Sequence, residues 1–276
     1  MTEPRTRRSS QRIAAVGTAQ DAATWEAHVV PRFSRLFGRM LLARLPSDER
    51  LQILDVGCGS GYPALDVLRR VGHGSRIVAI DPDAALVDLA RRRALDEAGR
   101  RIFFKVEAAD ALSFGDEVFD LVTANLALAT FQQPEGALRE MYRVLARGGR
   151  MLLTQPLSGT FEEVLDMFRE VSLKRDAPAI GQRTERIAAR YPTAGTLEAV
   201  VRSAGFEAIE IRTEEFQIPF GSAAAVFGDP MIHFVALPEW RWIAGFDDGG
   251  DEAILGQAQR HLDTYFGSGP FSLRVH

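Results

Sequence analysis

The stretch from Ile53 to Gly61 constrains the fold of this chain more than any other part of its sequence. It reads Ile-Leu-Asp-Val-Gly-Cys-Gly-Ser-Gly, so strand-forming residues run into glycines at every second position. Aliphatic and β-branched residues favour a buried strand, and alternate glycines let the backbone turn tightly beside a ligand. A turn of this kind at the carboxyl end of a parallel strand is where open α/β sheets bind their ligands.

The acid just before this turn indicates which ligand the turn accepts. Asp55 precedes the first glycine by two positions. A carboxylate there repels a pyrophosphate and attracts a ligand that carries an ammonium group. The methionine part of S-adenosylmethionine (SAM) carries such a group, so the acid favours SAM over a dinucleotide.

These residues resemble the first motif of the class I SAM-dependent methyltransferases, a strand that ends in an acid and is followed by Gly-x-Gly-x-Gly. Further landmarks of that family follow in order, namely Asp81-Pro82, Phe119-Asp120 and Gly148-Gly149. The resemblance is good over residues 50–156 and extends to the rest only in pattern. It implies a Rossmann-like α/β fold, SAM as cofactor, S-adenosylhomocysteine (SAH) as product and methyl transfer as the activity.

Alternating strand and helix patterns predict a seven-stranded, mostly parallel sheet with helices on both faces. We expect strands at residues 51–56, 76–80, 102–106, 119–124, 150–154, 206–211 and 271–275. We expect helices at residues 62–71, 84–97, 136–146, 161–171 and 197–204, with a polar linker from the fourth of these through residue 182.

The chain is interpreted as one methyltransferase domain, residues 1–276. Its parts are a disordered tail (1–20), an N-terminal helical segment (21–48), a SAM-binding core (49–213), an inserted helical cap (214–268) and a last strand (269–276). The tail is arginine-rich over its first dozen residues and lacks apolar periodicity, which is typical of disorder. Helical spacing of apolar residues predicts the N-terminal helix, with a break at Pro31.

Composition excludes some classes of protein. The net charge of −4 argues against a broad nucleic-acid surface, which is normally basic. The single cysteine rules out an intramolecular disulfide and fits a reducing compartment. The sequence has no apolar run long enough to span a bilayer and no visible signal peptide, so we expect a cytoplasmic protein. The oligomeric state stays open.

The resemblance implies which residues contact the cofactor. They are Asp55, Gly57, Cys58, Gly59 and Gly61 in the first turn, Asp81 and Pro82 at the ribose, Ala109, Asp110 and Ala111 at the adenine, and Asn125 and Leu126 at the methionine end. Three alternatives stay open. Asp81 is also placed to cap the following helix. Asp110 lies two residues after the family's usual acid position and also reads as a plain turn aspartate. Cys58 is either a nucleophile or a small packed residue.

The acceptor side is less defined. Residues 125–128, Asn-Leu-Ala-Leu, lack the two prolines and the aromatic that methylases of nucleic-acid base amino groups commonly carry at this point. The apolar run instead suggests the wall of a pocket for a small, partly apolar acceptor. Aromatic residues concentrated between residues 216 and 246 resemble the helical cap of the branch that works in ubiquinone and menaquinone biosynthesis. We expect most of them to form the cap's own core.

Two histidines are candidates for a general base, since a histidine titrates near working pH. They are His233 in the cap and His28 in the N-terminal helix, and either also reads as an ordinary structural histidine. The acidic residues Asp247, Asp248, Asp251 and Glu252 are interpreted as a solvated loop and a helix start, so no metal is expected.

The favoured hypothesis is therefore a SAM-dependent methyltransferase that acts on oxygen or carbon of a small molecule. Methylation of a protein side chain is an alternative and predicts an open groove. A SAM-binding regulatory protein without turnover is another, because the sequence shows no obvious base. A nicotinamide dehydrogenase is the weakest rival.

Overall fold

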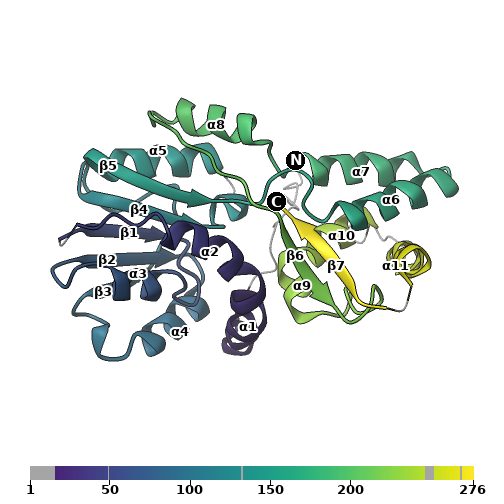
Figure 1. Cartoon of the computed structure of the whole chain (residues 1–276), viewed down its shortest axis with the longest axis horizontal. Coiled ribbons are helices and arrows are strands. Elements are labelled where there is room, and N and C mark those ends of the chain that lie inside the picture. The colour runs from purple at the N-terminus through teal and green to yellow at the C-terminus, as the bar shows by residue number, and fades with distance from the viewer. Residues whose placement is uncertain (1–15, 49, 132, 246–251, 268) are drawn as a thin grey trace, which may run out of the picture.

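Five parallel strands form the main sheet in the residues that the computed structural model describes, namely 16–48, 50–131, 133–245, 252–267 and 269–276. They are β1 (Gln52–Val56), β2 (Arg76–Asp81), β3 (Ile102–Val106), β4 (Phe119–Asn125) and β5 (Leu145–Thr154). The strands lie in the order β3-β2-β1-β4-β5 (Figure 1). The chain order reverses between β1 and β4, so the loops after these strands lie at the switch point where α/β sheets bind ligands.

Alternate residues of the strands pack on opposite faces of this sheet. Ile53 and Leu121 lie with α3 (Ala64–Arg70) in one buried cluster, and Leu54 and Val122 lie with α5 (Pro134–Val144) and α8 (Ala194–Ser203) in another. Helix α4 (Ala84–Ala94) follows β2, and the short 3-10 turns η2 (Leu95–Glu97) and η3 (Leu128–Thr130) complete this lobe. Apolar side chains on both faces explain the near-continuous hydrophobic strands of the sequence.

The prediction of a seven-stranded sheet is wrong. The sixth predicted strand, residues 206–211, has no ladder in the described structure, and Ala208 within it takes a left-handed conformation (φ 49°) that interrupts an extended run. The seventh predicted strand does form as β7 (Phe271–Val275). It pairs antiparallel with β6 (Phe216–Phe220) in a separate two-stranded sheet, where each strand buries every second residue.

The N-terminal segment is a continuous helix, and the predicted break at Pro31 is wrong. Helix α1 (Ala19–Thr24) runs into a π-helix, η1 (Trp25–Ser34), and then into α2 (Arg35–Leu42). The wider π register contains Pro31 without ending the helix. Residues 16–20 also differ from the predicted tail, because Val16 is buried and α1 begins within them. The rest of that tail lies outside the described residues.

A second lobe, which we call the cap lobe, lies beside the main sheet (Figure 1). It consists of α6 (Glu162–Lys174), α7 (Pro178–Ala188), β6, α9 (Pro230–Val235), α10 (Leu237–Ile243), α11 (Glu252–Phe266) and β7. The predicted polar linker through residue 182 is wrong, because α7 begins at Pro178, in the first turn where proline is tolerated. The cap lobe therefore draws on α6 and α7 as well as on the predicted insertion.

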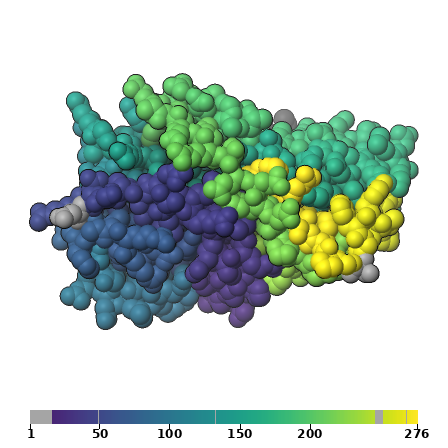
Figure 2. Space-filling view, viewed as in Figure 1, coloured from purple at the N-terminus to yellow at the C-terminus, as the bar shows by residue number. Residues whose placement is uncertain are grey.

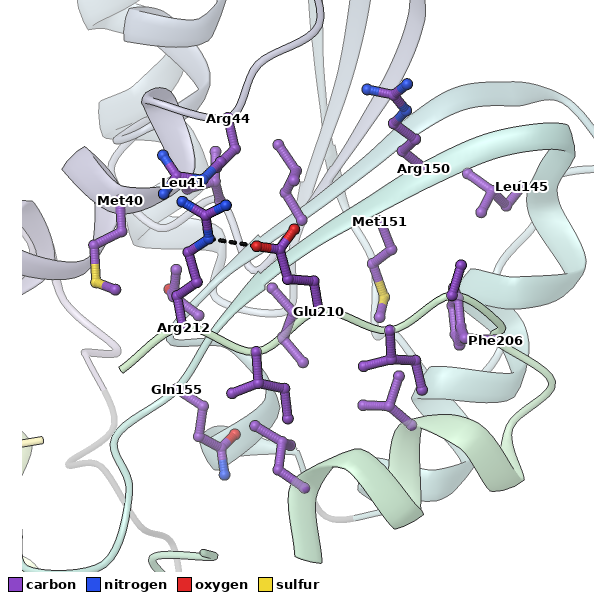
Figure 3. A pocket seen from close by; sticks show the side chains of 18 of the residues that line it. Met40, Leu41, Arg44, Leu145, Arg150, Met151, Gln155, Phe206, Glu210 and Arg212 are labelled. Carbon is purple, nitrogen blue, oxygen red and sulfur yellow. Dashed lines mark hydrogen bonds and ion pairs between the residues drawn. The ribbon is translucent and has the colours of Figure 1, made fainter. Parts of the chain in front are cut away.

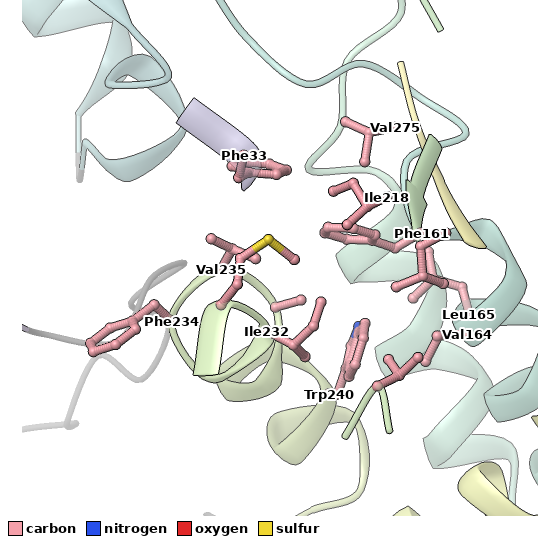
Figure 4. Close-up of a cluster of buried hydrophobic side chains, with 14 of the residues drawn as sticks. Phe33, Phe161, Val164, Leu165, Ile218, Ile232, Phe234, Val235, Trp240 and Val275 are labelled. Carbon is pink, nitrogen blue, oxygen red and sulfur yellow. The ribbon is translucent and has the colours of Figure 1, made fainter. Parts of the chain in front are cut away.

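One apolar cluster joins the cap lobe to the N-terminal helices. Its buried members include Phe33 from η1, Phe161 beside α6, and Trp240 from α10 (Figure 4). The rings of Phe33 and Phe161 stack at 6.2 Å, and those of Phe161 and Trp240 meet edge to face at 6.0 Å. The N-terminal helices are seated between the two lobes (Figure 2), so they form a wall shared by both.

Candidate active site

The glycine turn after β1 needs glycine for two physical reasons. Gly57, Gly59 and Gly61 all have positive φ (73°, 51° and 100°), which other residues rarely adopt. A Cβ on Gly57 would also come within 2.5 Å of the Ala127 Cβ. The turn is fastened to the next strand, because the amides of Gly57 and Cys58 both donate to the Ile80 carbonyl at 2.8 and 2.9 Å.

Asp55 is a buried carboxylate with half of its hydrogen bonding unmet. It is 1% exposed, and its Oδ1 accepts a hydrogen bond from the Thr123 hydroxyl at 2.5 Å. Its Oδ2 has no hydrogen-bond partner among the described residues. Burial raises the pKa of Asp55 to about 7, against the lowering effect of the Thr123 bond. A buried acceptor of this kind is costly unless a donor meets it, which fits the ammonium group of the cofactor.

Asp81 ends β2 and faces the glycine turn. It is 8% exposed, and it accepts hydrogen bonds from the amides of Gly59 and Asp83, each at 2.9 Å. Burial raises its pKa to about 6, although these two bonds lower it. Each carboxylate oxygen keeps a second lone pair, so two ribose hydroxyls can still donate to it. Asp81 is not a helix cap, because the side chain of Asp83 accepts from Ala85 and Leu86 at the start of α4.

Residues at the end of β4 belong to the same site as the glycine turn. Asn125 is buried, donates through Nδ2 to the Ser34 carbonyl of η1 at 3.3 Å, and accepts from the Thr154 hydroxyl at 2.8 Å. Leu126 has a left-handed backbone (φ 64°), and its amide donates to the Thr154 carbonyl at 3.0 Å. Strain of this kind in a non-glycine residue gathers at ligand sites.

The loop after β3 gives little evidence on how the adenine would be bound. Ala109 is buried against the sheet, whereas Asp110 and Ala111 are exposed at the surface of the loop. No hydrogen bond in the described structure uses the Asp110 side chain. The assignment of these three residues to the adenine therefore stays a prediction, as does that of Pro82 to the ribose.

Cys58 is a packed residue of the turn. Its side chain is fully buried, and burial raises the pKa of the thiol well above its ordinary value, with the charges of Asp81 and Asp55 adding to the effect. A thiol with a raised pKa is a poor nucleophile. The structure thus favours the packing role over the nucleophilic one.

Three residues at the site escaped the sequence analysis as functional candidates. Thr123 holds Asp55, Glu26 binds Ser60 of the glycine turn through a 2.6 Å hydrogen bond, and the Trp25 indole lies 3.8 Å from the position of a Cβ on Gly59. The helical spacing of Trp25 located its helix but not the face that meets the turn. The signal that could have identified Thr123 is its position on β4, directly beside Asp55 in the β1–β4 register.

The two candidate bases lie on the surface. His28 is exposed on η1, and His233 is exposed on α9 with its ring edge to face with Phe234 at 5.2 Å. Neither contacts Asp55 or Asp81 in the described hydrogen bonds and ion pairs. Their role as bases stays a prediction.

The aromatic residues of the predicted cap are mostly core. Phe216, Phe220, Phe234 and Trp240 are buried, and Phe227 and Trp242 pack partly buried against them. Phe246, Asp247, Asp248 and Asp251 lie outside the described residues, whereas Glu252 begins α11 as the sequence suggested. In the described parts of the chain, no three histidine, cysteine or acidic residues are grouped to hold a metal ion.

A cavity of about 1330 Å³ lies away from the glycine turn, along the outer edge of β5. Apolar side chains such as Met151 and Phe206 face it from β5 and from the extended segment after α8 (Figure 3). Glu210 and Arg212 pair with each other at 2.5 Å on that segment (Figure 3). Residues of the sixth predicted strand line this space without forming a ladder with β5 in the described structure.

A parallel sheet with a glycine turn and buried carboxylates at the ends of two adjoining strands defines a class I SAM-dependent methyltransferase. A family described as "Methyltransferase domain" matches residues 54–153. The chain is 32% identical to a ubiquinone/menaquinone biosynthesis C-methyltransferase of Xylella fastidiosa, over 60% of this chain and 68% of that protein. It therefore belongs to the family of SAM-dependent methyltransferases that includes this enzyme.

Further comparisons are consistent with this family and with its fold. The chain is 29% identical to the demethylmenaquinone methyltransferase of Lactococcus lactis, over 67% of this chain and 73% of that protein. Among solved structures, the YcgJ protein of Bacillus subtilis has a TM-score of 0.56 at 18% identity, over 87% of this chain and 94% of the other. A methyltransferase structure from Bacillus halodurans has a TM-score of 0.55 at 20% identity, over 86% and 94%. These two structures support the fold. None of the helices in the described parts of the chain is long and apolar enough to cross a membrane.

Proposed function

We propose that this SAM-dependent methyltransferase transfers a methyl group to carbon or oxygen of a small, partly apolar molecule. The observation that supports the proposal is that the apolar cluster of the cap lobe extends to the cofactor site. Trp25 and Leu126 pack against that cluster, and both also adjoin the cofactor site. An acceptor held there meets apolar and aromatic walls, which are typical of small-molecule sites.

The names of the relatives support a ring-shaped acceptor. The Xylella and Lactococcus proteins are named for ubiquinone, menaquinone or demethylmenaquinone, and the first is named a C-methyltransferase. We therefore expect an aromatic diol, the reduced form of a quinone, as the acceptor class. The electron-rich ring of such a diol is itself a nucleophile, and the enzyme contributes mainly alignment, which is worth roughly 7–11 kcal/mol in favourable cases.

The burial of Asp55 and Asp81, the two carboxylates assigned to cofactor binding, favours a small-molecule acceptor over a protein side chain. Both carboxylates are buried, and Glu26 and Trp25 of the N-terminal helix lie against the adjoining glycine turn. A cytoplasmic location and the lack of a nucleic-acid partner stay predictions, and His233 and His28 remain our candidates for a base. If either is a base, its replacement by alanine lowers turnover at neutral pH while leaving SAH affinity unchanged.

The test is transfer of label from methyl-deuterated SAM to reduced benzoquinones, reduced naphthoquinones and an extract of the source cells. We expect mass-shifted small molecules, lost with Asp81→Ala and kept with Asp96→Ala, an exposed control. NMR of the product then assigns the deuterated methyl to carbon or oxygen. Label found only on protein or RNA contradicts the proposal.

A further inference from the structure

The main sheet ends at β5 with an edge to which no other strand is bonded. From Arg150 to Thr154 the strand pairs with β4 on one side, and it is the last strand in the sheet order. On its other side, no backbone hydrogen bond joins it to residues 206–214 in the described structure. Such an edge presents a row of N–H and C=O groups on which another strand can pair.

The side chains of β5 are also less covered than those of its neighbour. Met151, Leu152 and Leu153 are only half-buried, whereas β4 is buried at every position except Asp120. Consecutive apolar residues in a parallel strand are normally buried on both faces of the sheet. The outer side of β5 therefore has the composition of a strand inside a sheet and the exposure of a strand at its edge.

The cavity of about 1330 Å³ beside this edge, which we call the β5 slot, has apolar walls above and below the plane of the sheet. Leu41 of α2 lines it and belongs to the buried cluster against which Leu152 packs. Val201 of α8 also lines it, and it belongs to the cluster against which Met151 packs. An added strand would thus lie between two helices, as an inner strand of an α/β sheet does.

The slot also carries two positive charges that have no partner. Among the charged side chains that line it, Arg44, Arg150 and Glu207 have no ion pair in the described structure. The others are paired, namely Arg39 with Glu214, Arg143 with Asp116, Arg147 with Glu117 and Arg212 with Glu210. Arg44 and Arg150 lie on the same side of β5 (Figure 3), so an acid on an added strand would meet positive charge there.

The chain's own segments fit the slot poorly. Residues 206–211 already form its far wall. The β5 edge of a second copy is excluded, because the same wall stands in front of it. The first dozen residues carry four arginines and one acid, the wrong charge for Arg44 and Arg150. A plain hydrocarbon would leave the N–H and C=O groups of β5 without partners.

We propose that the outer edge of β5 is a docking site for one extended segment of another polypeptide, which adds to the main sheet as a strand. The segment is apolar along its middle and carries an acid that meets Arg44 and Arg150. Main-chain hydrogen bonds supply the affinity in this mode of binding, and alternate side chains supply the specificity. The proposal does not depend on which acceptor is methylated.

The experiment measures binding of a synthetic strand to the full-length protein by fluorescence anisotropy. The probe is fluorescein-labelled Ser-Glu-Val-Thr-Val-Ile-Val-Ser. Two isomers carry N-methyl groups on alternate residues, so that each loses the N–H donors of one edge only. We expect saturable binding of the probe. One isomer should bind at least tenfold more weakly, because its backbone bonds to β5 are lost, and the other should bind as the probe does.

Charge reversal tests the acid. Arg150→Glu should weaken binding of the probe about fivefold, since an ion pair is replaced by repulsion, and should bind better the peptide in which lysine replaces the glutamate. Arg139→Glu is the control, because Arg139 is exposed on α5 outside the slot, and it should bind the probe as the wild type does. Thermal unfolding confirms that both variants are folded.

Four results would overturn the proposal. The first is the lack of saturable binding of the probe. The second is equal binding of the two methylated isomers, because the slot would then take an apolar ligand whatever its backbone. The third is an Arg150→Glu protein that does not distinguish the glutamate and lysine peptides. The fourth is a wild-type dimer in light scattering that Arg150→Glu dissociates, because a second copy would then cover the edge.

Discussion

Replacing Asp55 by asparagine should raise the free energy of unfolding of the cofactor-free protein. The same replacement should weaken binding of the cofactor. The carboxylate is buried and one of its oxygens is unpartnered in the described structure. Its ionised form is therefore disfavoured in the fold, and burial raises its pKa from 3.8 to about 7. An amide of the same shape removes the charge and can keep the hydrogen bond from Thr123.

The sign of the effect follows from the direction of the pKa change. Because folding raises the pKa of Asp55, the native state holds this proton more tightly than the unfolded chain does. The contribution of the group to stability is therefore full below about pH 4 and is lost as the pH rises to 7 and above. The difference between 3.8 and about 7 corresponds to about 4 kcal/mol of destabilisation at pH 8.

Asparagine recovers only part of this free energy. Its amide N–H₂ takes the place of the unpartnered oxygen, and an unmet buried donor costs roughly 1–3 kcal/mol. We expect the free energy of unfolding of Asp55→Asn to exceed that of the wild type by about 1–3 kcal/mol at pH 8. At pH 5, where wild-type Asp55 is protonated, the gain should disappear.

Cofactor binding should change in the opposite direction. An ionised Asp55 attracts the ammonium group, and asparagine lacks the charge. We expect SAH to bind Asp55→Asn at least tenfold more weakly at pH 8, the loss of ~1.4 kcal/mol or more. The wild-type affinity should itself fall as the pH drops from 8 to 5, because Asp55 and Asp81, with pKa values of about 7 and 6, take up protons.

Urea unfolding at pH 5 and pH 8 measures the stability, and titration calorimetry with SAH measures the affinity. Asp96→Asn, at an exposed position, is the control and should change neither. A loss of stability in Asp55→Asn at pH 8 would refute the reasoning, because it would mean that the carboxylate is well paired in the fold. An SAH affinity that does not depend on pH between 5 and 8 would refute the role given to its charge.

Other replacements in the cofactor site have equally definite outcomes. Asp81→Ala should weaken SAH binding about 100-fold or more in calorimetry, since two hydrogen bonds to a charged group are lost. Gly57→Ala should lower the free energy of unfolding by about 2 kcal/mol or more, because its Cβ meets Ala127 at 2.5 Å and its φ is 73°; Gly115→Ala, with its nearest neighbour at 3.7 Å, should not. The buried thiol of Cys58 should fail to react with a thiol reagent in the native protein and react at once in guanidinium, which absorbance readily shows.

The sequence predicted the parts of the fold whose cause is local. The five strands of the main sheet and the helices between them were located from the sequence pattern, because the strands are short runs rich in apolar residues and each helix is apolar along one face. The glycine turn was equally readable, since positive φ values at Gly57, Gly59 and Gly61 require the residue that the sequence shows. The acids at the ends of β1 and β2 followed from that turn.

Features that depend on distant parts of the chain could not be predicted in this way. The alternation at residues 206–211 is that of a strand, but Ala208 turns left-handed and β7 pairs with β6 instead. The same limit applied to Glu26, which is 34 residues from the Ser60 hydroxyl that it binds. A helical pattern says which face is apolar, but it does not say which loop a polar side chain on the rim will meet.

The free-energy cost of burying ionised carboxylates explains why the site favours a cationic ligand and the exclusion of water. Asp55 is destabilising while it is ionised and its Oδ2 lacks a partner, and a cationic ligand that pairs with it offsets that cost. Exclusion of water strengthens the pairing, because charges interact more strongly in a low-dielectric site.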